Sequence, residues 1–183
     1  MKKFLAVAVV ALASITASAQ YYVGGSFGIG YDSSAKKTQF TLVPEIGYSF
    51  SDNMAFGGTI GYTYNGSVKN SNGDDVSIEN YVQINPYLRY TFCRVADDKL
   101  SFFFDSTVGI GLGFQGGQTG VTYSIGFKPG IAYSLSDHCS LVAHMGFLGW
   151  EGASDKAKML GFNDKFSLDF SSMNVSFGFY YSF

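Results

Sequence analysis

The sequence predicts an all-β fold, a transmembrane eight-stranded antiparallel up-and-down β-barrel, on three observations. Apolar and polar residues alternate with period two along long segments, which is the pattern of β-strands with one apolar face. Aromatic residues make up 17% of the 183 residues and charged residues only 14%, whereas soluble domains contain about 25% charged residues. No charged residue falls on an apolar face of these segments.

The composition also excludes several classes of protein. A hydrophobic content of 46% with 2 cysteines excludes a disordered chain and a disulfide scaffold. The net charge is −2 and no cluster of lysine and arginine is present, which argues against nucleic-acid binding.

Residues 1–19 read as a secretory signal peptide. A basic start, MKK, precedes an apolar run from Phe4 to Ala13, and a small-x-small cleavage site ends at Ala19. The apolar run is shorter than the ~20 residues that a membrane-spanning helix needs. The expected mature chain, residues 20–183, is a single outer-membrane β-barrel domain.

The expected strands follow in chain order. They are Tyr21–Tyr31, Thr38–Phe50, Met54–Tyr64, Val76–Phe92, Leu100–Phe114, Val121–Leu135, Ser140–Trp150 and Ser171–Phe183. They are longer than the usual five or six residues of globular strands and match a tilted strand that crosses a bilayer.

Each of the first four strands has one apolar face. The apolar positions include Val23, Phe27 and Ile29, then Phe40, Leu42 and Ile46, then Met54, Phe56 and Ile60, then Val82, Ile84 and Leu88. The intervening positions are mostly glycine, serine, threonine and alanine, which are too small and too uncharged for a typical solvent face.

The last four strands repeat the pattern. Their apolar positions include Phe102, Phe104, Val108 and Ile110, then Val121, Ile125 and Phe127, then Leu141 and Phe147, then Phe177, Phe179 and Tyr181. The seventh strand is the least regular. Tyrosine and phenylalanine near the strand ends, with aliphatic residues between them, indicate the aromatic girdles of a barrel whose apolar face meets lipid.

Charges decide which face points outward. Those within strands lie on the polar face: Glu45, Glu79, Arg89, Asp105 and Lys128. A charge on the lipid face would cost roughly 2–4 kcal/mol at mid-bilayer. The alternative is a secreted soluble sandwich or lipocalin-like barrel, whose solvent face would carry many lysines and glutamates.

The connections alternate in length. The short ones are Ser51–Asn53, Cys93–Lys99 and Ser136–Cys139; the longer ones are Asp32–Lys37, Asn65–Asp75, Gln115–Gly120 and Glu151–Phe170. Short periplasmic turns and long extracellular loops are typical of outer-membrane barrels. Both termini are therefore expected in the periplasm.

The polar faces predict a lumen charge network. Its members are Glu45, Arg89, Asp105, Lys128 and His144, and the aromatic residues Tyr22, Tyr81, Tyr87, Phe103 and Tyr180 are expected to fill the bore beside them. Folding two strands about Ala96 makes Asp105 the diagonal neighbour of Arg89. Lys128 then lies beside Asp105 and faces Glu45 across the lumen. The alternative to a structural network of salt bridges is a path for ions or protons, and His144 is expected to be packed rather than catalytic.

The two cysteines, Cys93 and Cys139, both fall at the expected periplasmic end. That compartment is oxidising, so a disulfide is compatible with it. Three strand positions around an eight-stranded wall span roughly 15 Å, whereas a disulfide needs Cα atoms within about 7 Å. The sequence is therefore compatible both with a disulfide between the two cysteines and with two free thiols. The residues indicate no catalytic site, no cofactor and no metal, including at His138 and Cys139.

The C-terminal residues carry a family resemblance. Ser176, Gly178, Tyr181 and Phe183 match the polar-x-Gly-x-x-aromatic-x-aromatic assembly signal of outer-membrane barrels. The whole mature chain resembles the small porin-like eight-stranded barrels, namely OmpX, the OmpA membrane domain and the opacity-type proteins. The resemblance implies insertion into the Gram-negative outer membrane by the barrel assembly machinery, with outer-membrane lipid and lipopolysaccharide as partners.

The expected function is non-enzymatic. A barrel with a filled lumen would present extracellular loops for surface contact or envelope integrity, and the charged loop 151–170 is the expected contact for an extracellular ligand. The same loop could instead only extend its two strands as a β-ribbon. The alternatives are a narrow porin-like channel and a lipid-modifying enzyme.

Overall fold

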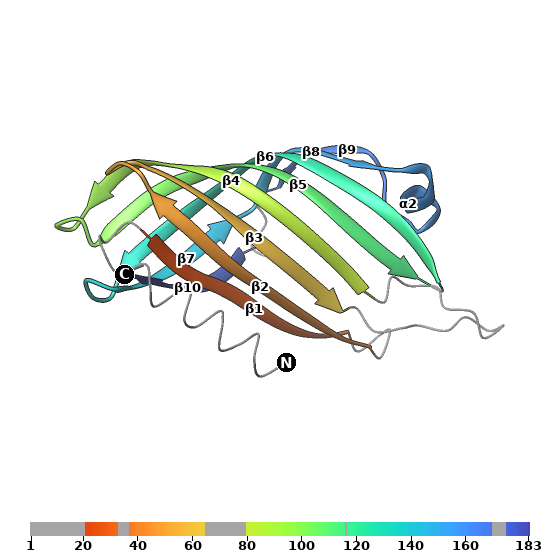
Figure 1. Cartoon of the computed structure of the whole chain (residues 1–183), viewed down its shortest axis with the longest axis horizontal. Helices are drawn as coiled ribbons and strands as arrows, with labels where there is room; N and C mark the ends of the chain where they lie inside the picture. Colours follow the sequence, from red (N-terminus) through yellow and green to blue (C-terminus); the bar gives the residue numbers. More distant parts are fainter. Residues whose placement is uncertain (1–20, 33–36, 65–79, 116, 170–174) are drawn as a thin grey trace.

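The computed structural model describes residues 21–32, 37–64, 80–115, 117–169 and 175–183, which form a closed antiparallel β-barrel (Figure 1). The ring consists of β1 (Tyr21–Asp32), β2 (Lys37–Ser49), β3 (Met54–Tyr64), β4 (Asn80–Val95), β5 (Leu100–Gln115), β6 (Gln118–Ser134), β7 (Cys139–Met145) and β10 (Val175–Ser182). Pairing of β10 with both β7 and β1 closes the ring. The predicted eight-stranded barrel is confirmed. The predicted signal peptide and Glu79 lie outside the described residues.

Strand β5 shows why the barrel has a polar interior. Its inward residues Phe103 and Asp105 are only 1% and 3% exposed, whereas the outward residue Ile110 is 56% exposed. Alternation with period two places successive side chains on opposite faces of the wall. The apolar face therefore points away from the barrel, as the absence of charges on it predicts.

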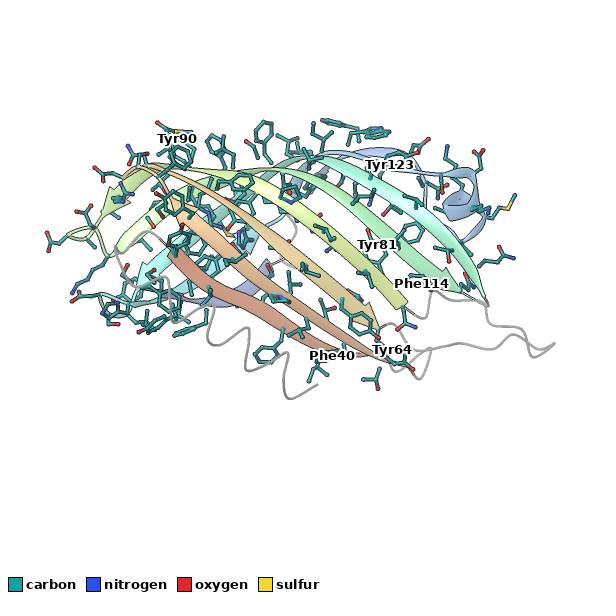
Figure 2. All side chains as sticks on the ribbon, viewed as in Figure 1. Phe40, Tyr64, Tyr81, Tyr90, Phe114 and Tyr123 are labelled. Carbon is teal, nitrogen blue, oxygen red and sulfur yellow. The ribbon has the colours of Figure 1, made fainter. Side chains whose placement is uncertain are left out.

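The outer surface is a continuous apolar belt. Ile60, Ile84 and Ile110 lie directly opposite one another on three adjacent strands, and all three are exposed. Figure 2 shows aromatic residues near both ends of the strands: Phe40, Tyr64 and Phe114 toward one end and Tyr90 toward the other. The end where β1 begins and β10 finishes is called the termini end, and the opposite end the loop end. In the part of the chain that the structure describes, no helix is long and apolar enough to span a bilayer.

A β-bulge changes the register between β4 and β5. Thr91 pairs with Phe103 but Cys93 pairs with Phe102, so Phe92 is an extra residue on β4. The turn that follows contains three residues with positive φ, from Ala96 to Asp98. As a result Asp105 lies directly opposite Arg89, and the predicted diagonal arrangement is wrong.

The seventh predicted strand is broken into two. Gly146, with φ of 75°, separates β7 from β8 (Phe147–Ala153). Both pieces pair with β6, but β7 pairs with β10 on its other side, whereas β8 pairs with β9 (Lys165–Asp169). A glycine adopts this conformation without the steric cost that a side chain would add.

The predicted loop 151–170 therefore contains regular structure. Its first residues continue β8, and it includes helix α2 (Asp155–Met159) and β9. Ser154 caps the helix, because its hydroxyl accepts a hydrogen bond from the Ala157 N–H at 3.3 Å. Ala157 packs so closely against Gly120 of β6 that a side chain there would collide with it. The β-ribbon interpretation of this segment matches the pairing of β8 with β9.

The prediction of a loop over Gln115–Gly120 is also wrong, because most of these residues belong to β5 and β6. Gln115 pairs with Gln118, so the ladder between β5 and β6 continues through most of the predicted loop. Gly117 has φ of 76°, a conformation that glycine adopts without steric cost.

Candidate functional site

Arg89 is the centre of a buried polar layer near the termini end of the bore. Its guanidinium binds the Asp105 carboxylate in a bidentate manner, with Nε to Oδ1 at 2.7 Å and Nη2 to Oδ2 at 2.8 Å. Direct pairing of the two residues across β4 and β5 produces this geometry. Bidentate arginine–carboxylate pairs are among the strongest hydrogen-bonded contacts in proteins.

Glu45 ties the second wall of the barrel to the same arginine. Its Oε1 lies 3.4 Å from Nη2 of Arg89 and accepts a short hydrogen bond from the Tyr87 hydroxyl. The Tyr87 and Tyr22 hydroxyl oxygens lie 2.6 Å apart, so the chain of hydrogen bonds reaches β1. Tyr180 of β10 joins through its hydroxyl, 3.1 Å from Nη2 of Arg89.

Aromatic rings surround the guanidinium. The Arg89 Cζ atom lies 4.0 Å from the Phe103 ring centre and between 5.1 and 5.7 Å from those of Tyr87, Tyr180 and Tyr22. Cation–π attraction is strongest where water is absent, and these four rings are buried in the bore as predicted. The rings and the charges together join β1, β2, β4, β5 and β10 in one buried layer.

His144 completes the layer on the side of β7. Its Nε2 lies 3.0 Å from Oδ2 of Asp105, and its ring stands edge-on to Phe103 with centroids 5.4 Å apart. An ionised carboxylate only accepts hydrogen bonds, so the His144 Nε2–H is the donor and Oδ2 of Asp105 is the acceptor. The two contacts hold the ring between Asp105 and Phe103.

Lys128 has its expected place beside Asp105 but not, among the described residues, the expected ion pair. It lies directly opposite Asp105 on β6, but within the described ranges neither a hydrogen bond nor an ion pair joins it to another side chain. Both oxygens of Asp105 are occupied by Arg89 and His144. The structure therefore brings Glu45, Arg89, Asp105 and His144 together and leaves the Lys128 ammonium outside their contacts.

Two cavities lie above this layer, toward the loop end. The lower one, of about 400 Å³, is lined by Glu45, Asp105, Lys128 and His144 together with small polar residues. The upper one, of about 320 Å³, lies under Phe162 and is lined by Tyr81, Thr122 and Glu151 among others. Gln83 and Asn85 line both, so the cavities adjoin along the bore.

The sequence did not indicate that Phe162 would enter the bore. Its ring packs against Tyr81 with centroids 5.7 Å apart and contacts the position of Gly113. Phe162 follows α2 in an irregular stretch with no alternation, and its only signal was an aromatic residue within a charged loop.

The cysteines are not bridged in the structure. Cys93 is exposed and Cys139 half-buried, and both thiols are free. Among the described residues, no three histidine, cysteine, aspartate or glutamate side chains are grouped so that they could hold a metal ion. His138 instead places its Nδ1 at 2.9 Å from the Ser182 carbonyl oxygen.

The four residues of the C-terminal motif lie on or just after β10. Ser176, Gly178 and Tyr181 belong to the strand, and the Phe183 N–H donates to the Tyr21 carbonyl at 3.0 Å. The rings of Tyr181 and Phe183 meet edge to face with centroids 5.2 Å apart. The motif thus lies where the last strand meets the first.

The ribbon at the loop end is held by surface charges. Lys158 and Asp164 form an ion pair at 2.6 Å, and Lys165 pairs with Glu151 at 2.9 Å. The hydrogen bond from Lys158, assisted by the Ala153 N–H, holds the pKa of Asp164 below its ordinary value. The contact with Asp164 is therefore lost as pH falls through that lowered pKa.

A family model described as the outer membrane protein beta-barrel domain matches residues 4–183. No curated protein matches this chain.

Proposed function

Since the chain belongs to the outer membrane protein β-barrel domain family, we propose that it is a non-enzymatic surface barrel with a filled, non-conducting bore. The observation that carries the proposal is the layer around Arg89, where buried charges and four aromatic rings occupy the bore between opposite walls. Eight strands enclose a space that side chains can fill. A narrow channel is disfavoured because any ion would have to displace this layer.

The surface role is assigned to the ribbon at the loop end. Met159 of α2 is 81% exposed, Phe166 and Leu168 of β9 are also exposed, and the charged pairs of the ribbon lie at the surface as well. Rigid scaffolds commonly carry their contacts on such connecting segments. The proposed contacts are lipopolysaccharide or another component outside the cell.

Conductance tests the closed bore. In planar bilayers we expect the unmodified protein to produce only rare, small current steps, because the Arg89 layer blocks the path. Single-channel recording at several salt concentrations measures this. A steady, ion-selective current would overturn the proposal and favour the porin-like channel.

The proposed orientation places both termini in the periplasm. It is supported by the tight turns at the termini end and by the ribbon at the opposite end. The free thiol of Cys93 reports on this orientation, because it is exposed at the termini end.

We expect a membrane-impermeant maleimide to leave Cys93 unlabelled on intact cells and to label it once the outer membrane is permeabilised. Mass spectrometry of the purified protein measures the labelling. In the matched control, both cysteines are replaced by serine and exposed Lys156 of α2 by cysteine, and this variant should react on intact cells. Labelling of Cys93 on intact cells would contradict this orientation and place the termini end outside the cell.

A further inference from the structure

The barrel wall separates between β1 and β10. Their pairing runs from Tyr22 opposite Ser182 to Ser26 opposite Gly178 and stops there. Both strands nevertheless continue, since β1 extends to Asp32 beside β2 and β10 begins at Val175 beside β7. The described residues above Ser26 and Gly178 therefore form a seam without a ladder between the two strands.

The lower cavity reaches this seam. Its lining includes Ser26 and Gly28 of β1 and Ser176 of β10, together with Lys128 and His144 deeper in the bore. Phe27 and Phe177 line it as well, and these outward rings are 75% and 72% exposed. The cavity thus connects polar groups inside the barrel with apolar groups on its outer surface.

In the described part of the chain, the Lys128 ammonium lines the polar part of the cavity with neither a hydrogen bond nor an ion pair, although the Asp105, Glu151 and Glu45 carboxylates attract it from a longer distance. Arg89 and His144 use both Asp105 oxygens, and Arg89 and Tyr87 share Oε1 of Glu45. Within the described part of the chain the Lys128 ammonium has no such contact, although it lines the same cavity. A charge removed from water is costly unless it is paired, so this site favours an anion.

The seam offers an apolar surface beside this anion-favouring site. A lipid-facing wall has no water to satisfy open strand edges, whereas the rings of Phe27 and Phe177 offer an apolar surface at the edges of this seam. We propose that the lower cavity binds an anionic single-chain amphiphile. Its carboxylate or phosphate head lies on Lys128, and its tail leaves between β1 and β10 into the bilayer.

This proposal rests on the location of the barrel in a membrane but not on the proposed surface contact of the ribbon. A titration in phosphatidylcholine nanodiscs tests it, with dansyl-labelled undecanoate as the probe and dansyl-labelled undecanol as the uncharged match. We expect saturable binding of the carboxylate above the level of empty nanodiscs, about tenfold tighter than that of the alcohol. Dodecyl phosphate should displace the carboxylate probe if phosphate and carboxylate heads share the site.

Two variants separate the head from the tail. Lys128→Gln should weaken binding of the carboxylate about tenfold and leave the alcohol unchanged, while Lys99→Gln in the exposed β4–β5 turn serves as the matched control. Gly28→Leu should weaken both probes, because a Cβ at Gly28 has only Thr41 nearby, at 3.8 Å, and the side chain can fill the mouth of the cavity.

Equal affinity of the unmodified barrel for carboxylate and alcohol would overturn the proposal, as would unchanged carboxylate binding by Lys128→Gln. If Lys128→Gln does not fold, Gly28→Leu decides, and unaltered binding by that variant would overturn it. A conducting bore would refute the proposed closed barrel without affecting these titrations, so the two failures are distinguishable.

Discussion

Replacing Arg89 by alanine is expected to lower the free energy of unfolding by about 3–5 kcal/mol, the cost of leaving buried charges without a partner. Asp105 would lose both of its hydrogen bonds to the guanidinium, and Glu45 would lose its cation. Denaturant titration of the protein refolded into lipid vesicles, followed by heat-modifiable migration, measures the change. The emptied layer should also admit small ions in planar bilayers.

Arg94→Ala is the matched control on the same strand. Arg94 is exposed at the termini end, where its Nη1 donates to the Asn53 side chain at 2.6 Å, and its loss should change stability by no more than about 0.5 kcal/mol. The double variant Arg89→Ala/Asp105→Ala should be less destabilised than the sum of the single variants, because the two residues interact directly. Equal stability of Arg89→Ala and Arg94→Ala would contradict the importance of the layer.

Removal of Phe183 is expected to leave most of the protein unfolded in the periplasm. The proposed reason is that the assembly machinery recognises the motif that ends at this residue. The structure adds a second reason, since the Phe183 N–H holds the end of the chain to Tyr21 of β1. Fractionation of cells and gel migration with and without heating measure the folded fraction in the outer membrane.

Phe179→Ala provides the control for this deletion. It removes an exposed aromatic residue from the same strand but leaves all four motif residues in place. We expect normal insertion of Phe179→Ala and partial rescue of the deletion by a terminal tyrosine. A normal amount of folded protein without Phe183 would show that the motif is dispensable.

Most of the fold was predictable because alternation with period two is a strong signal over long strands. The breaks in that pattern were not predictable. The hairpin turns between Val95 and Leu100 and not about Ala96, and the extra residue at Phe92 then shifts the register by one, so Arg89 meets Asp105 and not Phe103. Gly146 was one of several glycines in the barrel, and only its φ identifies it as the break between β7 and β8.

The sequence predicts which residues line the candidate site but not which of them touch one another. Period two alone places Glu45, Arg89, Asp105 and Lys128 inside the barrel. Which carboxylate meets which cation depends on register and on the reach of each side chain. Arg89 spans from Asp105 to Glu45 and pairs with both acids, whereas Lys128 forms no ion pair in the part of the chain that the structure describes. The hydroxyl pair of Tyr22 and Tyr87 joins strands far apart in the sequence, and no local pattern reports it.

The unequal lengths of the strand ladders have a consequence for the order of folding. The β5–β6 ladder runs unbroken from Leu100 opposite Tyr133 to Gln115 opposite Gln118, within one stretch of chain. The β1–β10 ladder is short and joins the two ends of the domain. Contacts local in sequence lose less chain entropy when they form. The long hairpin should therefore nucleate the sheet, and closure at β1 and β10 should be the last step in assembly and the first to reverse.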